Sequence, residues 1–393
     1  MTGTMDAALG AREANLGRVL QIVHLDGPQS RAALTERTGL NRSTTASLVA
    51  ELLDLGLVDE SAPEPTKRVG RPSPMASVNP TVVAIAANTE VDAITLGAIR
   101  LDQTVAVRER IAVDGPLSPQ ATADLIGERV RSWASDELVG HRIVGVGIAV
   151  PGLVRAADGL VRQAPHLGWR DAPLRDLVAA ASGLAAHVGN DASLGALAEH
   201  LYGAARGVDD VVYLDSASGI GGGLIVHGMP VSGAAGYAGE FGQNRPGMGE
   251  HDDRRAPGGV LEDEVNRDRV LAMLGISHVD EPALAAAIAA SDDPAVAAEL
   301  ARQSRILAHA LGNAVNVLNP SVVVLGGFLS TLATEAPGDL LEQVRAQSMP
   351  ANGEDLEIRP AMLGVDRLLV GAAELAYRDL LRFPLQTAAR WMS

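Results

Sequence analysis

A small group of basic residues near the N-terminus carries the first chemistry that the sequence suggests. Lys67, Arg68 and Arg71 lie close together in the chain, and Arg42 precedes them. Cationic side chains grouped in this way neutralise phosphates, which is the sequence-independent part of DNA binding. Lys67 is the only lysine of the chain. We therefore interpret this stretch as a candidate DNA contact, and the elements around it must place it.

Three helices with a tight turn precede the basic group. Leu16, Val19, Leu20 and Val23 recur at helical spacing, and the Gly27-Pro28 pair ends that helix. A second helix follows with Ser30 as its N-cap and Gly39 at its end, and Asn41 caps a third helix. Helix, turn and helix in this order are typical of a DNA-binding motif.

The third helix has two different faces. Thr45, Leu48, Val49 and Leu52 share one face, and small side chains share the other. In a helix-turn-helix the second helix enters the major groove with its N-terminal residues near the bases. The predicted contacts are Arg42, Ser43, Thr44 and Ser47.

The segment after the third helix completes this unit. Residues 57–79 read as a short hairpin wing with a Pro-rich tip, in which Gly-Arg-Pro at 70–72 offers an arginine to a narrow minor groove. A small helical bundle without a DNA role is the alternative interpretation. The adjoining basic wing favours the DNA-binding one.

The charge of the chain is unevenly distributed. Its net charge is −16. Residues 1–80 hold 8 Lys and Arg against 9 Asp and Glu, a balance of −1, which leaves −15 for residues 81–393. Because an acidic surface repels phosphates, DNA contact must come from the first segment.

The remainder of the chain alternates strands and helices. Consecutive strands are expected at 82–89, 92–102 and 104–113, followed by a helix near 119–138 and a buried strand that enters a Pro-Gly turn at 143–154. Further strands flank the glycine-rich turn of 211–228, and another occupies 321–330. Glycines at strand ends suit the close approach of a ligand. This pattern predicts an α/β fold.

The ordered motifs of this part resemble the ROK family of repressors, open reading frames and kinases. They are VGIAVPGLV, APHLGW, GNDASLGALAEHLYGAARG, SGIGGGLIVHG, SGAAGYAGEFGQ, LNPSVVVLGG and LLVGAAELA. The resemblance implies a multidomain chain with a winged helix-turn-helix at 1–80 and a two-lobed α/β, actin-like (ribonuclease H-like) sugar-kinase fold at 81–393. Lobe one would be about 81–187 plus 366–393, and lobe two about 188–365.

The resemblance also implies a sugar site. The family's ligands fall on Asn190, Asp191, Glu240 and Glu262, and Gln243 stands where the family has a histidine. Converging carboxylates and amides suit neighbouring hydroxyls, each of which is both donor and acceptor. Asp191 matches the family's catalytic base, but the same geometry serves binding equally well. A simple helix cap is the alternative for the Asn-Asp pair.

Two departures from the family pattern predict a chain without cofactor. The family's three zinc cysteines fall on Asp253, Arg255 and Val260, so we expect no zinc, and expect packing alone to hold Glu262. The acidic stretch at 251–253, with His251 and Asp252, reads as a solvated loop instead of a metal site. In the first phosphate motif Asn88 replaces the Asp and Glu90 repels a phosphate, so ATP binding and catalysis are not expected.

These observations predict a sugar-responsive, DNA-binding transcriptional regulator. It would be a repressor that releases its operator when a sugar binds in the cleft. Its partners would be double-stranded operator DNA and a sugar effector, and it would form a homodimer or homotetramer. A chain without cysteine, leader or long apolar run is expected in the cytoplasm, away from membranes. An active ATP-dependent sugar kinase and a ligand-independent repressor are the alternatives.

Overall fold

The chain packs into two compact units, which together contain every described residue. The computed structural model describes residues 2–61, 74–216, 219–247, 253–256, 258–277 and 279–390. Unit 1 comprises the described parts of Met1–Ala149, Ala172–Val188 and Ala372–Ser393, and unit 2 those of Val150–Asp171 and Gly189–Gly371. The division into domains at 1–80 and 81–393 stays a prediction.

The N-terminal part of unit 1 is a winged helix. Its elements are α1 (Thr2–Asp26), β1 (Gln29–Ser30), α2 (Arg31–Thr38), α3 (Arg42–Asp54), β2 (Val58–Ser61) and β3 (Met75–Val78). Ser30 accepts a hydrogen bond from the amide of Ala33, and Asn41 accepts one from the amide of Thr44. Gly39 ends α2 with a φ of 69°, a left-handed conformation that favours glycine. The predicted caps are confirmed.

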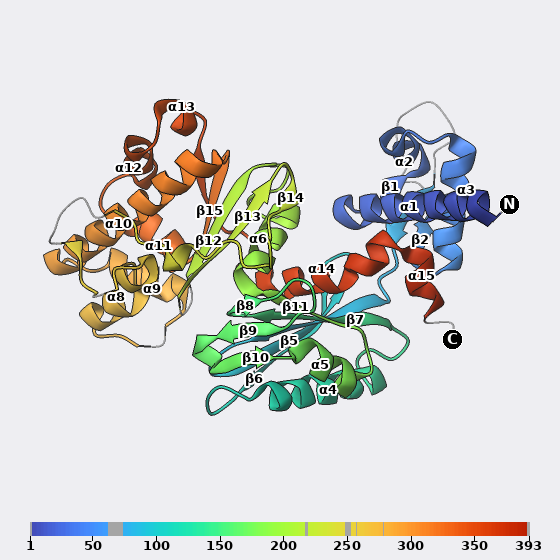
Figure 1. The fold of residues 1–393 in the computed structure, drawn as a ribbon, viewed down its shortest axis with the longest axis horizontal. Helices are drawn as coiled ribbons and strands as arrows, with labels where there is room; N and C mark the ends of the chain where they lie inside the picture. Colours follow the sequence, from blue (N-terminus) through green and yellow to red (C-terminus); the bar gives the residue numbers. More distant parts are fainter. Residues whose placement is uncertain are drawn as a thin grey trace. The chain divides into compact units, whose positions relative to one another are not determined.

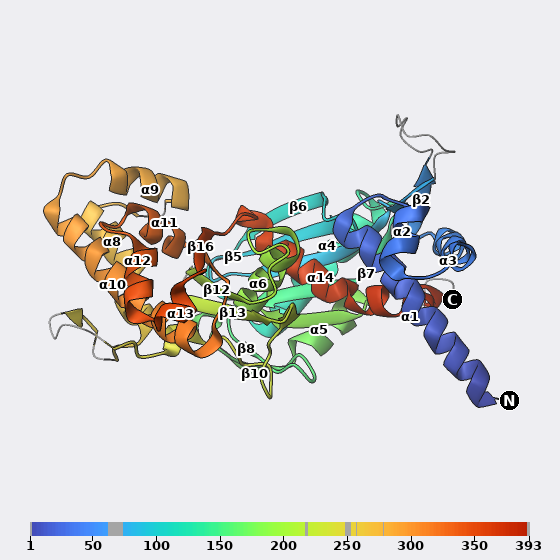
Figure 2. The same ribbon diagram turned by 90° about the horizontal axis from the view of Figure 1, so that it is seen from above.

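The predicted wing strands are present, and they complete a small sheet. Strands β2 and β3 pair antiparallel, with Val58 opposite Val78, and β1 joins the far side of β3. The tip between β2 and β3 lies outside the described residues. Figure 2 shows α1, α2 and α3 grouped beside β2. Fully buried leucines of the three helices, Leu16, Leu20, Leu34, Leu48 and Leu52, form the core.

The rest of unit 1 is built on a five-stranded sheet. Its strands are β4 (Val82–Thr89), β5 (Ala93–Arg100), β6 (Val105–Ala112), β7 (Arg142–Val150) and β11 (Ala186–Asn190), in the order β11-β7-β4-β5-β6. Helices α4 (Pro119–Ser135) and α5 (Leu174–Ser182) cover one face, and α14 (Arg367–Arg382) covers the other (Figure 1). A Cβ on Gly147 of β7 would lie 1.8 Å from the carbonyl oxygen of Ala372, so only glycine lets α14 pack this closely.

Unit 2 repeats the same sheet plan. Its strands are β12 (Val211–Ser216), β13 (Ile220–Val226), β14 (Met229–Pro230), β15 (Val322–Gly327) and β16 (Glu357–Pro360), in the order β14-β13-β12-β15-β16. In both sheets the first strand lies in the centre, antiparallel to the second and parallel to the fourth. This repeated order defines the two-lobed ribonuclease H-like, or actin-like, architecture that the sequence predicts.

Helices and short segments complete unit 2 around its sheet. They are β8 (Leu153–Val154), β9 (Val161–Ala164), η1 (Pro165–Leu167), β10 (Trp169–Ala172), α6 (Asp191–Tyr202), η2 (Phe241–Gln243), α7 (Leu261–Glu264), α8 (Arg267–Leu274), α9 (Glu281–Ala289), α10 (Pro294–Leu318), α11 (Phe328–Glu335), α12 (Leu340–Gln347), α13 (Pro350–Gly353) and η4 (Gly364–Asp366). The last helix, α15 (Pro384–Ala389), belongs to unit 1. Among the described residues, no helix has the length and apolarity needed to cross a bilayer.

Within unit 1, α1 of the winged helix is fixed to α14. His24 is fully buried, with Nδ1 2.6 Å from the carbonyl oxygen of Leu101 and Nε2 2.9 Å from Oε1 of Glu374. Gln21 of α1 donates to the carbonyl oxygen of Leu381 at 3.1 Å. Both nitrogens of His24 face acceptors, and Nε2 of Gln103 lies 3.2 and 3.3 Å from the two ring nitrogens. Only the protonated ring can donate to both acceptors, the Leu101 carbonyl and the Glu374 carboxylate. A buried ion pair therefore joins the two helices.

We predict that this ion pair makes stability depend on pH. Burial lowers the pKa of His24, but the charge and hydrogen bond of Glu374 outweigh it and raise this pKa above 6.5. The stabilisation is thus complete below pH 6.5 and is lost as pH rises through the higher, folded-state pKa. His24→Gln should cost about 3 kcal/mol at pH 5.5. Above pH 6.5, the unfolding free energy of this variant, measured by urea denaturation, should also fall less with rising pH than that of the wild type.

The exposed His227 provides the matched control, because its side chain is 89% exposed. His227→Gln should leave the pH profile of the wild type unchanged. If His24→Gln and wild type lost the same unfolding free energy between pH 5.5 and 8.5, the His24–Glu374 pair would not be the source of the dependence.

Candidate functional site

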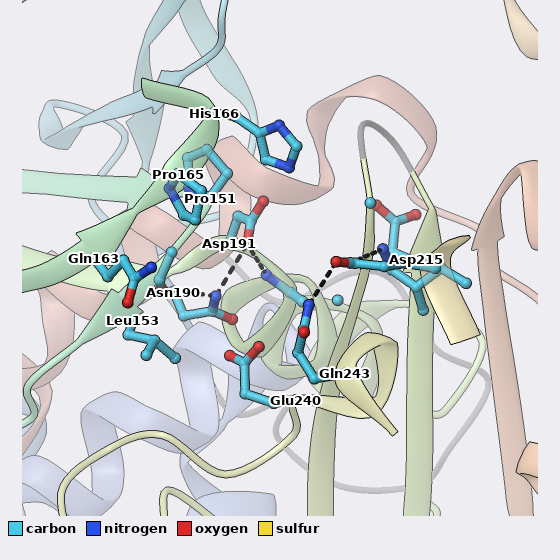
Figure 3. Close-up of a pocket in the computed structure, with 16 residues that line it drawn as sticks. Pro151, Leu153, Gln163, Pro165, His166, Asn190, Asp191, Asp215, Glu240 and Gln243 are labelled. Atoms are coloured by element: carbon cyan, nitrogen blue, oxygen red, sulfur yellow. Dashed lines mark hydrogen bonds between the residues drawn. The ribbon is translucent and has the colours of Figure 1, made fainter. Parts of the chain in front are cut away.

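A pocket of about 360 Å³ lies within unit 2, and each of its walls comes from a different part of the chain. The turn before β8, the β9–η1 segment, the start of α6, the β12–β13 turn, η2 and α7 all contribute. Figure 3 shows the side chains of Asn190, Asp191, Glu240 and Gln243 gathered around it. A small ligand of monosaccharide size fits a space of this volume.

The five predicted sugar ligands all line this pocket: Asn190, Asp191, Glu240, Gln243 and Glu262. They come from segments as far as 72 residues apart in sequence, between β11 and α7, and the fold alone brings them together. Whether they bind a sugar stays a prediction.

Asn190 has two roles in the geometry of the pocket. Its Oδ1 accepts from the amide of Ser193 at 2.9 Å, so it is the N-cap of α6. Its Nδ2 donates to the carbonyl oxygen of Gly152 at 3.1 Å. The helix-cap interpretation and a place in the pocket are therefore compatible, because capping fixes the side chain at the wall.

The acidic groups of the pocket disfavour one another's charge. Burial raises the pKa of Asp191 to about 7, and the nearby carboxylates of Asp215 and Glu240 add to the rise, although the amide of Ala192 opposes it. Burial also raises the pKa of Glu240, and the charge of Glu262 contributes. Desolvation and like charges both penalise ionised carboxylates. A hydroxyl donor or a proton beside these carboxylates would reduce this penalty.

Glu262 reaches the pocket through space that two glycines leave open. A Cβ on Gly219 or Gly242 would lie 2.7 or 2.8 Å from its Oε2. The amide of Ile220 donates to the same oxygen at 3.3 Å, and Nε2 of Gln243 donates to Oε1. The glutamine at the family's histidine position therefore holds Glu262 directly.

Three further polar residues line the pocket that the sequence did not identify as ligands: Gln163, His166 and Asp215. Asp215 follows the buried part of β12 and accepts from Nη2 of Arg367 at 2.7 Å. His166 lies in η1, and Figure 3 shows its ring beside Asp191. The APHLGW motif contained the signal for His166. Asp215 had none, because its partner is more than a hundred residues away in sequence.

The predicted DNA contacts divide into described and undescribed residues. On α3, Arg42, Ser43 and Ser47 are exposed and Thr44 is half-buried. Lys67, Arg68 and Arg71 lie outside the described residues. The sequence missed Arg12 on α1, which donates to Oγ of Ser47 at 3.3 Å and pairs with Glu51 at 2.5 Å. A second arginine therefore adjoins the exposed face of α3.

The first strand turn of unit 1 holds Glu90 in a local network. Its Oε1 accepts from Nδ2 of Asn88 at 3.2 Å and from Oγ1 of Thr95 at 2.8 Å, and Arg110 pairs with its Oε2. The carboxylate is thus fixed at the end of β4, at the position where the family resemblance places the first phosphate motif.

The residues at the family's zinc positions do not fit that metal. Asp253 accepts from Nη2 of Arg305 at 2.8 Å, Arg255 carries a cation, and Val260 offers no ligand atom. In the described ranges, no three His, Asp or Glu side chains lie close enough to hold a metal ion. His251 and Asp252 lie outside the described residues. The expectation that packing alone holds Glu262 is wrong, because Glu264 on the same helix forms a buried ion pair with Arg302 at 2.9 Å.

A winged helix, two sheets of one order and an acidic pocket define a class of regulator with a sugar-kinase-like body. The family model described as "ROK family" matches residues 85–379, and the chain belongs to the ROK family. The xylose repressor of Caldicellulosiruptor bescii is 28% identical over 377 residues, which cover 90% of this chain and 93% of the repressor. This chain is therefore a repressor-like member of the family.

Two further comparisons relate the chain to a kinase sequence and to a solved structure. A glucokinase of Streptomyces coelicolor is 30% identical over 284 residues, which cover 67% of this chain and 88% of the kinase. The crystal structure of a ROK family transcriptional regulator, a homologue of the E. coli Mlc protein, aligns with a TM-score of 0.79 and 23% identity over 97% of this chain and 100% of that one. At this identity the likeness shows the fold alone.

We predict that replacing Asp191 stabilises the protein in alkaline buffer. The pKa of Asp191 is 3.8 in a model peptide and about 7 in the folded chain, so its contribution to stability is present at low pH and lost as pH rises through 7. Each unit of difference corresponds to about 1.4 kcal/mol. At pH 8, Asp191→Asn should raise the unfolding free energy in urea by a few kcal/mol.

Asp355 supplies the control, because it is an exposed aspartate of the same unit. Asp355→Asn should follow the wild-type curve from pH 4 to pH 8. Parallel curves for Asp191→Asn and wild type would contradict the assignment of the raised pKa to this carboxyl.

Proposed function

We propose that the protein is a sugar-responsive DNA-binding repressor, whose effector occupies the pocket of unit 2. The convergence of five polar side chains, which the family resemblance assigns to sugar binding, on one pocket carries this proposal. The exposed Arg42 of α3, on a winged helix in the same chain, supports the DNA-binding half. Repressor relatives that match almost the whole chain support the same function.

The chemistry of the pocket favours an uncharged polyol. Asp191, Glu240 and Glu262 offer acceptors to hydroxyl hydrogens, while the amide of Gln243 and the ring of His166 add polar atoms around the same space. A phosphorylated sugar would add anionic charge beside three carboxylates, which is unfavourable. We therefore propose a neutral monosaccharide as effector, and D-xylose is the first candidate because relatives are named xylose repressors.

We propose that the chain binds this sugar without phosphorylating it and without ATP or zinc. The carboxylate of Glu90 is fixed at the turn that binds a phosphate of ATP in a kinase. Its negative charge would repel that phosphate. The glucokinase relative matches only 67% of the chain, whereas the xylose repressor matches 90%. A match to 90% of the chain must extend into residues 1–80, where the winged helix lies, and this favours regulation over catalysis.

Helix α14 supplies the proposed route from sugar to DNA. Its first residue, Arg367, belongs to unit 2 and binds Asp215 at the pocket. From Ala372 the helix belongs to unit 1, where Glu374 pairs with His24 of α1. A sugar that shifts Arg367 would thus bias the winged helix, and a coupling of about 1–3 kcal/mol suffices for a response. We propose a homodimer or homotetramer on a palindromic operator.

The sugar proposal predicts a ligand that raises the melting temperature. D-xylose, D-glucose and N-acetyl-D-glucosamine are compared on the full chain, and a sugar at a hundred times its Kd adds about 2.7 kcal/mol to stability. Glu240→Gln and Gly219→Ala should abolish most of this shift, since the first removes an acceptor and the second displaces Glu262. Gly247→Ala is the control, because a Cβ on Gly247 would meet no described atom within 4 Å other than those of its neighbours in the chain.

Three outcomes would count against parts of this proposal. No shift with any sugar would favour a ligand-independent repressor. Release of ADP from ATP in the presence of a stabilising sugar, lost in Asp191→Asn, would show a kinase. A shift that survives both pocket substitutions would place the sugar elsewhere.

The DNA proposal predicts a change in salt dependence. Arg42→Ala and Arg71→Ala are titrated with duplex DNA of random sequence, because phosphate contacts do not depend on sequence. Each lost phosphate contact should lower the slope of log K against log salt by about 0.9. Arg175→Ala on the exposed surface of α5 is the control and should keep the wild-type slope. Equal slopes in all four proteins would exclude these arginines as phosphate contacts.

A further inference from the structure

A buried arginine of unit 2 lies directly behind the helix that carries Glu262. Arg302 on α10 is 3% exposed, and each of its five N–H groups has an acceptor. Nε and Nη2 bind the two carboxylate oxygens of Glu299 at 2.9 and 2.8 Å. Nη1 binds Oε2 of Glu264 and the carbonyl oxygen of Asp253 at 2.9 and 2.6 Å, and Nη2 also binds the carbonyl oxygen of Glu264 at 2.8 Å. The guanidinium has no donor left for another partner.

Glu264 extends this contact to the loop before α7. Its side chain is fully buried, and the amides of Arg255 and Ala256 donate to its carboxylate at 3.0 and 2.8 Å. The loop is fixed a second time where Arg305 of α10 pairs with Asp253. Two carboxylates, of Glu264 and Asp253, and two arginines therefore connect α10, α7 and the segment at 253–256.

Helix α7 is too short to hold its own position. It has four residues, fewer than an isolated helix needs for stability. Its amide at Leu261 binds the carbonyl oxygen of Asn244 at 2.8 Å, and the Leu261 side chain is buried in the core of unit 2. Glu264 provides the anchor at the other end, and Glu262 lies between the two. The position of the Glu262 carboxylate in the pocket thus depends on the Glu264–Arg302 pair.

We propose that Glu264 and Arg302 are positioning residues that set the pocket geometry of Glu262. They take the place of the metal-held cross-link that the ROK resemblance implies for this loop, whose residues Asp253, Arg255 and Val260 do not fit zinc. The inference rests on the proposed function only where sugar affinity is measured. The positioning itself has a readout that needs no ligand.

The test compares Glu264→Gln with a chemically matched control in the full-length chain. Glu264→Gln keeps the size of the side chain but removes the charge, and it leaves Arg302 paired with Glu299, which guards against unfolding. Glu281→Gln is the control, because it removes a different glutamate–arginine ion pair, Glu281–Arg267, from the same unit. Val344→Ala, at a fully buried core position on α12, controls for general loss of stability.

Hydrogen exchange gives the decisive readout. We expect the amides of Ala256, Leu261 and Ile220 to exchange at least tenfold faster in Glu264→Gln. The amide of Ile220 reports on Glu262 itself, because it donates to that carboxylate. Exchange in β15 should stay at the wild-type rate, and Glu281→Gln should leave the three amides protected, whereas Val344→Ala should raise exchange throughout unit 2. Unchanged exchange in Glu264→Gln, or an equal rise throughout unit 2 as expected for Val344→Ala, would overturn the proposal. So would a rise in wild-type exchange on adding EDTA, since a metal would then hold the loop.

Sugar affinity gives the second readout, with D-xylose and D-glucose as probes. Glu264→Gln should weaken the affinity at least tenfold, and Glu281→Gln should preserve it. Failure of both sugars to bind wild type would count against the proposed function, while the exchange result would still decide the positioning role. Faster exchange with unchanged affinity would show that Glu264 holds the loop without setting the pocket, which would overturn the proposal.

Discussion

The crowding of carboxylates in one small pocket is the constraint on which the rest of unit 2 depends. Asp191, Glu240 and Glu262 line the same space, and the pKa of Asp191 is raised to about 7. A fold does not bring desolvated acids together without opposing forces. Here the cap of α6, the glycines of the β12–β13 turn and the anchors of α7 hold each acid in position. Stability is thus given up for a surface rich in hydrogen-bond acceptors, which in the proposed function would bind the hydroxyl groups of a sugar.

Local features of this chain were predictable from its sequence, whereas contacts between distant segments were not. Ser30, Gly39 and Asn41 were predictable caps because capping is local. The strands at 82–113 were predictable because apolar residues either run through them or alternate with polar ones. The fold class followed from ordered motifs. Contacts between distant segments gave no such pattern.

The pocket shows this limit most clearly. The motif in the sequence indicated Glu262. The expectation from the sequence was that packing alone would hold this residue in position. The observed support is an ion pair between α7 and α10, 38 residues apart, and neither Glu264 nor Arg302 belongs to a recognisable motif. Asp215 was missed for the same reason, since its charge has meaning only beside Arg367.

A buried ion pair and a metal cross-link solve the same problem with different consequences. A metal supplies binding energy to a loop and is lost when its ligands are protonated or a chelator competes. Arg302 stays protonated, and burial of both partners shields the pair from salt, so its hold on Glu262 does not depend on metal supply. The cost is desolvation, which five hydrogen bonds to Arg302 offset. In the proposed function, such a regulator would respond to a sugar without a metal, because Glu264 and Arg302 would supply the support that a metal-held cross-link would give.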